Sequence, residues 1–400
     1  MNKNVSERIN KMITKKIKTE AGNKTKDVDS SNGERNNNLR DKFFNRSELN
    51  NKLNFAKVRA ENTVWLGFEK AVAHYENPSM YPLPSESNTV ERAFHDLLTV
   101  LPNSKRKKLV DKINETLKAG SSVRVNRYKD LVNVNFNSTL PITEQVKAMQ
   151  VPAEMIFTEE EGIEITAEYK RKAEESKNTG YSTSSNPVPQ QAASASKISF
   201  FVDNMTCLNP DDVRKDEINL AGFSIDSTGN NIKFDPFFVG KFRKNETVLL
   251  GDKSKLFTLD IDPNQIAQSF IAGLFIIESD LISNQETVDK LVTLFLVIGL
   301  AITVVTGVLI VVTVLSAPVI TPFIATLLIG IASTFYVIGL QFIPLMGDDI
   351  SFDVTDTLAI ADKVDIGETF QRTITIGKGR DPKSSFDGKY SAAARWVGEA

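Results

Sequence analysis

The feature that most constrains this chain is a long apolar stretch in its second half. Positions 291–347 contain no Asp, Glu, Lys, Arg or His. About 20 consecutive apolar residues already span the hydrocarbon core of a bilayer, so this stretch is long enough for two crossings. Pro318 and Pro322 interrupt any helix near its middle and predict a turn there. The segment 291–346 is therefore expected to form a hydrophobic two-helix hairpin.

Insertion of this hairpin into a bilayer is predicted to be favourable. Each Leu, Ile, Val or Phe near the bilayer centre contributes about −0.3 to −0.6 kcal/mol, and no charged side chain opposes that gain. The alternative is a pair of fully buried helices in a large soluble core, although such helices usually carry charged residues at their ends. A transmembrane β-hairpin is disfavoured because its alternation of apolar and polar residues fails at the adjacent Val304 and Val305.

Small residues are spread along both halves of the hairpin, where they let two helices approach closely in lipid. The residues expected to carry membrane insertion are Leu291, Phe295, Gly299, Gly307, Leu315, Pro318, Pro322, Phe323, Gly330 and Gly339. No charged residue lies at the tip of the hairpin, so the tip itself can cross a membrane at low cost.

Two crossings leave both flanks of the hairpin on one side of the membrane. The flanks 271–290 and 347–366 are acidic, so the excess of Lys and Arg that marks cytoplasmic flanks is nearly absent. Anionic lipid repels such flanks until their carboxylates are protonated, which permits an acid-promoted insertion step. Residues 1–20 are polar and basic and lack the apolar core of a secretory signal peptide. We therefore expect a membrane-associated protein made without such a signal, and release or delivery by a signal-independent route stays open.

The whole chain is expected to be a multi-domain α+β membrane protein. Its expected parts are a disordered basic arm (1–50), a mainly helical region (51–177), a flexible linker (178–196), a β-sandwich-like domain (197–285), the hairpin (291–346) and a β-rich acidic C-terminal segment (347–400). The arm has few large apolar residues, and the linker is rich in small polar residues and proline. The β-sandwich-like domain is predicted from short apolar runs separated by Asn, Gly, Asp and Pro.

Apolar periodicity predicts the individual elements. Helices are expected at 53–75, 90–101, 105–117 and 158–177, and an extended segment at 123–136. Strands are expected at 198–202, 218–220, 223–225, 232–234, 237–239, 248–250, 256–258 and 270–277, and after the hairpin at 351–360, 369–376 and 389–396. The hairpin is thus expected to be inserted between β elements.

Residues suited to catalysis are scarce. The chain has two histidines, His74 and His95, and one cysteine, Cys207. No nucleophile elbow, phosphate-binding loop or zinc motif accompanies them, so we expect a non-enzymatic protein. Each histidine is expected on a helix surface, and Cys207 is expected to be buried and structural. A single cysteine excludes an intrachain disulfide.

Four acidic residues near the start of the β-sandwich-like domain are candidate calcium ligands. They are Asp211, Asp212, Asp216 and Glu217. Calcium prefers oxygen ligands, but the spacing does not match an EF-hand loop. Ordinary solvated loop acids are the alternative and the commoner case. No other cofactor is expected.

Charge is distributed unevenly along the chain, although the net charge is only −2. Residues 1–130 carry an excess of Lys and Arg, and the remainder carries an excess of Asp and Glu. A basic front part can bind anionic lipid or an acidic protein partner, or it can simply be a solvated surface. Nucleic acid is not the favoured partner, and the oligomeric state is left open.

The charge-free segment 291–346 resembles, in length and lack of charge, the central helical hairpin of channel-forming colicins. The resemblance carries no residue-specific motif, and the predicted flanking strands depart from the helical bundle around colicin hairpins. It implies membrane insertion and assigns no family. The leading hypothesis is a bacterial-type, toxin-like or effector-like protein that permeabilises a membrane through this hairpin. The alternative is a constitutive membrane anchor or adaptor that recruits a partner complex through its basic N-terminal part and β-sandwich.

Overall fold

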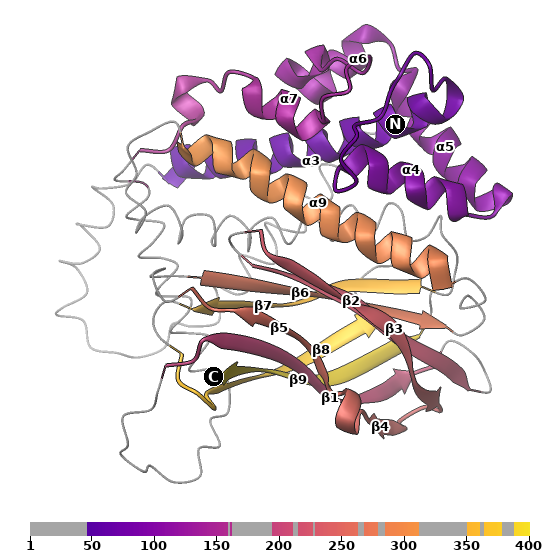
Figure 1. The fold of residues 1–400 in the computed structure, drawn as a ribbon, viewed down its shortest axis with the longest axis vertical. Helices are drawn as coiled ribbons and strands as arrows, with labels where there is room; N and C mark the ends of the chain where they lie inside the picture. The colour runs from indigo at the N-terminus through magenta and orange to yellow at the C-terminus, as the bar shows by residue number, and fades with distance from the viewer. Residues whose placement is uncertain are drawn as a thin grey trace. The chain divides into compact units, whose positions relative to one another are not determined.

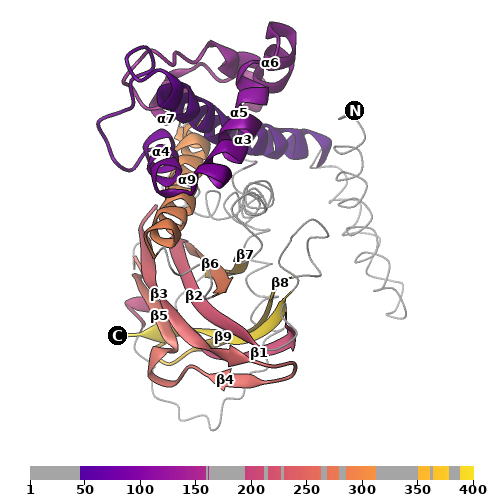
Figure 2. The same ribbon diagram turned by 90° about the vertical axis from the view of Figure 1, so that its right-hand side faces the viewer.

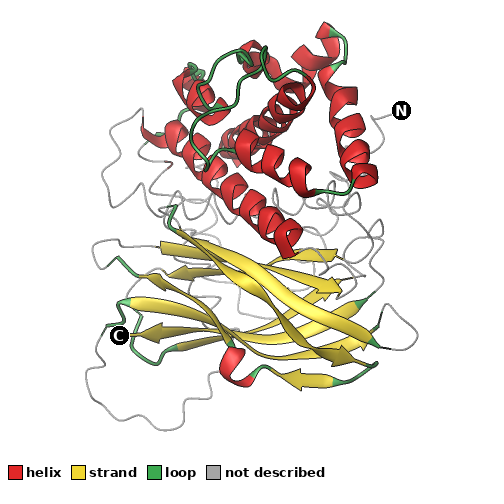
Figure 3. Ribbon diagram, turned by 45° about the vertical axis from the view of Figure 1, so that its right-hand side comes forward, coloured by secondary structure: helices red, strands yellow, loops and turns green. Residues whose placement is uncertain are grey.

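The chain folds into helices and antiparallel sheets, as expected for an α+β protein (Figure 1 and Figure 3). The computed structural model describes residues 46–158, 161, 194–210, 215–226, 229–262, 268–278, 285–311, 350–360, 364–377 and 388–400. The chain divides into two compact units, Met1–Asn50 and Asn51–Ala400, and nearly all the described residues belong to the second. The predicted arm, the linker and the helix at 158–177 lie mostly outside the described residues.

The first half of the described chain is helical. Its elements are α3 (Arg46–Glu76), α4 (Val90–Val100), α5 (Asn103–Leu117), α6 (Ser121–Tyr128), the 3-10 helix η1 (Lys129–Asn133), α7 (Ile142–Ala148) and the 3-10 helix η2 (Ala153–Met155). The helices predicted at 53–75, 90–101 and 105–117 are confirmed. Thr89 caps α4, because its hydroxyl accepts a hydrogen bond from the backbone N–H of Arg92 at 3.4 Å. Pro102 separates α4 from α5, since it cannot continue a helix.

The extended segment predicted at 123–136 is wrong, because these residues form α6 and η1. Two side chains that lie four residues apart on α6 bind the same buried carboxylate on α3. Arg124 Nη1 lies 2.6 Å from Glu69 Oε2, and the Tyr128 hydroxyl lies 2.6 Å from Glu69 Oε1. Residues at this spacing share one helix face, so the helical conformation is the one that lets both reach Glu69.

The second half of the described chain forms two antiparallel sheets. Its strands are β1 (Lys197–Asn209), β2 (Asp216–Asp226), β3 (Asn231–Phe242), β4 (Thr247–Leu249), β5 (Lys255–Asp260), β6 (Gln268–Glu278), β7 (Ile350–Ile360), β8 (Thr369–Gly377) and β9 (Lys389–Glu399), with a 3-10 turn, η3 (Gly251–Lys253), before β5. One sheet has the order β4-β1-β9-β8, with β5 also paired to β1, and the other has the order β3-β2-β6-β7.

The predicted strands are all present, but two pairs of them merge. The runs at 218–220 and 223–225 are parts of β2, and those at 232–234 and 237–239 are parts of β3. The register between these strands shifts where Leu220 pairs with Phe237 and Gly222 with Phe234. Pro236 falls in this irregular part of β3, which is an edge strand, so its missing N–H is tolerated. Gly and Pro at these two places were expected to separate one strand from the next. They instead cause local irregularities within continuous strands.

Both sheets contribute to one apolar core, which gives the region a β-sandwich-like architecture. Phe200 of β1 stacks on Phe257 of β5 with ring centroids 5.2 Å apart. Trp396 of β9 lies 4.7 Å from Phe200 and 6.1 Å from Phe270, which belongs to the other sheet. Cys207 is also buried in this core, as expected from its sequence context. Aromatic side chains from strands distant in sequence thus join the two sheets.

The strands that follow the apolar stretch complete both sheets. β9 pairs with β1 along its whole length, and β7 pairs with β6. The register places Ile277, near the end of β6, opposite Ile350, the first residue of β7. The segment between these neighbouring strands contains the helix α9 (Gln285–Val311). The apolar segment is therefore inserted in the chain between two neighbouring strands of one sheet.

Candidate functional site

The candidate site is α9 together with the elements that cover it. Its first turns carry Glu286, Asp289 and Lys290, and no charged residue follows within the helix. Buried apolar side chains occupy half of the positions 286–305: Val288, Leu291, Val292, Leu294, Phe295, Val297, Ile298, Ala301, Ile302 and Val305. At 3.6 residues per turn these positions cover the greater part of the helix circumference, and the partly exposed positions 289, 290, 293, 296, 300, 303 and 304 form one stripe on the remaining side. A helix with so wide an apolar surface has to be covered over most of its circumference, either by protein or by lipid.

Two layers of protein provide this cover. α9 contacts β2 and β3 on one side and α4 and α7 on the other, and it lies between them in Figures 1 and 2. Phe295 packs edge-on against Phe275 of β6, with ring centroids 5.4 Å apart. Among the side chains of α9 whose exposure is described, Val304 is the large apolar one that is more than a third exposed, at 37%. Most of the described part of the charge-free stretch is thus sheltered from water.

Two ion pairs fix the beginning of α9 to the two layers. Asp289 accepts a hydrogen bond from the Lys233 ammonium of β3, which also reaches the Thr293 hydroxyl at 3.2 Å. The neighbouring Lys290 lies 3.7 Å from Asp96 of α4. All four charged side chains are between 33% and 40% exposed, so each pair contributes only about 0–1 kcal/mol. The two ion pairs therefore orient α9 but contribute little to holding it in place.

The helix α4 is in turn held against α3. Phe68 and Phe94 pack with ring centroids 4.3 Å apart. The two helices approach closely at Gly67, where a Cβ atom would lie 2.7 Å from a methyl carbon of Val90. Glycine is therefore required at this crossing. Beyond it, two pairs of polar side chains connect the helices at successive turns.

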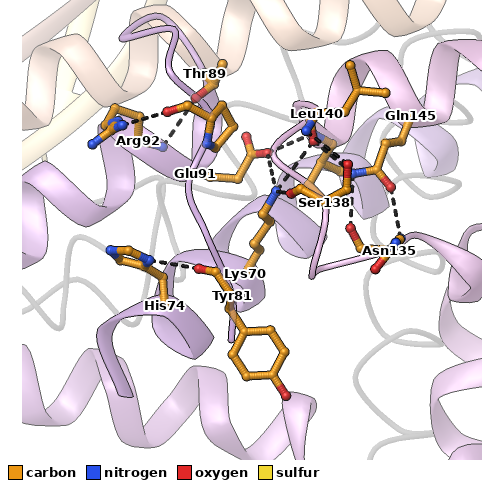
Figure 4. Close-up of polar contacts among 12 residues, drawn as sticks. Lys70, His74, Tyr81, Thr89, Glu91, Arg92, Asn135, Ser138, Leu140 and Gln145 are labelled. Atoms are coloured by element: carbon orange, nitrogen blue, oxygen red, sulfur yellow. Dashed lines mark hydrogen bonds and ion pairs between the residues drawn. The ribbon is translucent and has the colours of Figure 1, made fainter. Parts of the chain in front are cut away.

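The first of these pairs is Lys70 with Glu91 (Figure 4). Their charged atoms lie 3.9 Å apart, and both side chains are fully buried. The Lys70 ammonium donates to the carbonyl oxygens of Ser138 at 2.7 Å and Leu140 at 3.4 Å. Glu91 Oε1 accepts from the backbone N–H of Ile142 at 2.7 Å, at the start of α7. The pair therefore ties α3, α4 and the loop before α7 together.

Burial dominates the ionisation of this pair. It raises the pKa of Glu91, although the N–H of Ile142 and the Lys70 ammonium both favour the carboxylate. Burial also lowers the pKa of Lys70, against the attraction of Glu91. The second oxygen of Glu91 has no hydrogen-bond partner. A buried charge pair with one unsatisfied oxygen contributes little net stability, yet loss of either partner is costly.

The second pair is His74 with His95, one turn further along each helix. Their ring centroids lie 5.0 Å apart in an edge-to-face arrangement. His74 Nδ1 lies 2.8 Å from the carbonyl oxygen of Tyr81, so this nitrogen carries the proton and donates it (Figure 4). His95 Nδ1 is buried without a hydrogen-bond partner and lies 3.8 Å from Asp96 Oδ1. The two histidines expected on helix surfaces therefore contact each other between helices.

The environment of His95 opposes its protonation. Burial lowers its pKa most, followed by the proximity of His74, while Asp96 acts in the opposite direction. Arg92, one turn earlier on α4, also disfavours the imidazolium. The neutral form of His95 is thus the one that the arrangement of α3 and α4 stabilises.

The predicted membrane-inserting residues fall into two groups. Leu291, Phe295 and Gly299 are buried in α9, and Gly307 also lies in this helix. The remaining predicted residues, which are Leu315, Pro318, Pro322, Phe323, Gly330 and Gly339, lie outside the described residues. The structure thus describes the first helix of the predicted hairpin and leaves the turn and the second helix undescribed.

The candidate calcium ligands that the structure describes do not converge. Asp216 is buried and accepts a hydrogen bond from the Tyr390 hydroxyl, whereas the half-exposed Glu217 pairs with Lys241. Successive side chains of a strand point to opposite faces, which separates these two carboxylates. Asp211 and Asp212 lie outside the described residues. Within the described ranges, no group of three or more His, Cys, Asp or Glu side chains is placed to hold a metal ion.

Sequence reasoning missed the two polar pairs between α3 and α4. A signal for them is present, because Lys70 and His74 are spaced four residues apart, and so are Glu91 and His95. This spacing puts each couple on one face of its helix. The pairing of the two faces depends on the connection between α3 and α4, which carries no periodic pattern.

One helix among the described residues, over Glu286–Val305, is long and apolar enough to cross a membrane. Its window is 61% buried within the protein, and the mostly buried core helix of a soluble protein meets the same criteria of length and composition. Comparisons with protein families, with curated proteins and with solved structures give no match to this chain.

Proposed function

We propose that this chain is a non-enzymatic protein that inserts the apolar segment 291–346 into a lipid bilayer. One observation carries the proposal: α9 has buried apolar side chains over most of its described circumference, has no charged residue on any side after Lys290, and continues into a stretch without any charged residue. A helix that serves only as a core element of a soluble protein does not need such a continuation. In the proposed mechanism, β2, β3, α4 and α7 store α9 until lipid replaces them.

The way the covering elements are held supports this mechanism. The ion pairs at the start of α9 are half-exposed, and the contact between α3 and α4 contains buried polar groups instead of a wholly apolar seam. Such contacts can separate at a lower cost than an apolar interface of the same size. The ladder between β6 and β7 does not include α9, so the sheet can persist while the segment leaves. The storage fold and the inserted state are therefore compatible.

Insertion in the proposed mechanism is as a two-helix hairpin with its turn near Pro318 and Pro322. The acidic flanks stay on the side of the β-sandwich, and the tip without charged residues crosses first. Permeabilisation of the target membrane, as by a toxin or effector, follows when several hairpins associate. This part of the proposal rests on the sequence, because the turn and the second helix lie outside the described residues.

The alternative function is a constitutive membrane anchor or adaptor. Cell fractionation distinguishes such an anchor from a stored protein that inserts later. The full chain is expressed, membranes are washed with carbonate, and the soluble fraction is analysed by gel filtration. We expect a monodisperse soluble pool that floats with added liposomes and releases an encapsulated dye. Carbonate-resistant membrane residence without a soluble pool would identify a permanent anchor. A soluble pool that never binds liposomes at any pH between 5 and 8 would show that α9 is only a core helix.

A further inference from the structure

The chain contains only two histidines, and they lie in contact with each other. Histidine is the side chain whose ordinary pKa places its charge change in the mildly acidic range. His74 comes from α3 and His95 from α4, so their contact reports directly on the distance between these helices. Any separation of α4 from α3 breaks this pair.

α4 also connects the histidine pair to the stored helix. Asp96, the residue after His95, lies 3.7 Å from Lys290 of α9 and 3.8 Å from the unpartnered Nδ1 of His95. A proton on this nitrogen makes His95 a second cation that competes with Lys290 for one carboxylate. The event at the histidine pair is therefore transmitted to α9 through a single neighbouring side chain.

The groups around His95 decide what its protonation does to the interface. From α3, the ring of His74 faces it, and a proton on both rings places two cations at a centroid separation of 5.0 Å. From α4 itself, Arg92 adds repulsion and Asp96 adds attraction. From α9, Lys290 already occupies Asp96. The balance favours separation of the two helices in acid, because two neighbouring cations oppose one shared anion.

We propose that the His74–His95 pair is an acid-operated latch, which holds α4 over α9 at neutral pH and releases it when both rings are protonated. This proposal rests on the proposed membrane insertion, because it explains how α9 is uncovered before it inserts. The opening of the latch itself can occur and be measured without a membrane.

In the closed arrangement α4 lies against α3, and in the open arrangement the two helices are separated. The sign of the pH effect follows from the pKa of His95, which is lowered from 6.5 in the closed arrangement. The open arrangement therefore binds the proton more tightly. The closed arrangement keeps its full stability above pH 6.5 and loses stability as the pH falls from 6.5 towards the lowered pKa. Glu91, faced by Lys70 and Glu86, acts in the opposite direction, because its pKa is raised from 4.5 in the closed arrangement. Only variants of the histidines can therefore assign the opening to the latch.

The test uses the full-length chain without lipid. Hydrogen exchange of residues 285–305 is measured at pH 7.5 and pH 5.0 and corrected for the intrinsic pH dependence of exchange. We expect protection to fall at least about tenfold in acid. In His95→Phe, which retains an aromatic ring but cannot be protonated, protection should not fall in acid. Tyr75→Phe, a neighbouring exposed aromatic residue on α3, is the matched control and should open like the wild type.

Unchanged protection in the wild type, or equal opening in wild type and His95→Phe, overturns the latch. If His95→Phe does not fold, the two imidazole signals of the wild type decide by nuclear magnetic resonance. The buried contact predicts that the imidazole signal of His95 titrates below pH 6.5. A His95 signal that titrates at or above pH 6.5 overturns the proposal. Opening in acid without any binding to liposomes would leave the latch intact and refute the proposed function instead.

Discussion

The substitution Val304→Lys is expected to affect the stored state of α9 and its membrane-inserted state differently. Val304 lies near the middle of the predicted first membrane helix, yet among the α9 side chains whose exposure is described it is the most exposed large apolar one in the closed fold, at 37%. A lysine at this position can extend its ammonium into water while its methylene groups cover the same apolar surface. The same lysine would lie close to the bilayer centre after insertion. The two states therefore respond differently to one added charge.

The magnitudes follow from these two environments. In the closed fold, a substitution at a partly exposed position costs less than about 1 kcal/mol. In the bilayer, lysine costs roughly 2.5–3.5 kcal/mol at a helix centre, whereas valine contributes a few tenths of a kcal/mol favourably. The difference of about 3 kcal/mol reduces the insertion equilibrium by about 100-fold, since 1.4 kcal/mol corresponds to a factor of 10.

Flotation with liposomes measures the insertion equilibrium, and urea unfolding measures the stability of the soluble form. Val125→Lys on α6 is the matched control, because Val125 is 49% exposed and lies outside the apolar segment. We expect Val304→Lys to unfold at nearly the wild-type urea concentration and to lose flotation, while Val125→Lys retains both. Wild-type flotation and dye release by Val304→Lys would refute the reasoning that α9 enters the hydrocarbon core.

Three further outcomes test the fold. In Gly222→Ala, a Cβ atom would lie 2.9 Å from the Phe234 ring and also inside the contact distance of a backbone oxygen of β6, so urea unfolding should show a loss of about 3 kcal/mol. Cys207 is buried and burial raises its pKa, so a thiol reagent should label it only in denaturant; labelling of the native protein would contradict its position in the core. The Lys255 ammonium lowers the pKa of Glu399 from 4.5, so the stability contribution of this pair is present above pH 4.5 and is lost as the pH falls through the lowered pKa. Glu399→Gln should therefore cost less than about 1 kcal/mol at pH 7 and nothing at pH 2, and an equal cost at both pH values would rule out this pair as the cause.

The strands of this protein were predictable because their signal is local. In β1, Ile198, Phe200 and Val202 alternate with half-exposed or polar positions, and all three are buried in the core. Gly222 and Pro236 misled the prediction, since both residues usually end a strand. In the structure, Gly222 instead admits the close approach of the neighbouring strand β6, and Pro236 lies on an edge. Glycine and proline occur both at the ends of strands and within strands such as these. Only the neighbouring strands therefore show which of the two cases applies.

The site was less predictable because its contacts are long-range. The apolar character of α9 is visible in the sequence, but its cover is not. Lys70 meets Glu91 and two carbonyl groups from the loop before α7, and no pattern within either helix encodes that meeting. The segment 123–136 was expected to be extended, whereas Arg124 and Tyr128 lie on one face of a helix there and both bind the buried carboxylate of Glu69. Local propensity was overridden by tertiary contacts in this case.

The position of β9 has a consequence for the order in which the protein is made. β9 lies in the interior of its sheet, between β1 and β8, although it follows the apolar segment in the chain. A ribosome therefore releases the whole apolar segment before the strand that joins β1 to β8 exists. During that interval both sheets are incomplete, because β7 of the second sheet is also made after the segment. The apolar segment is therefore complete before its own sandwich can close.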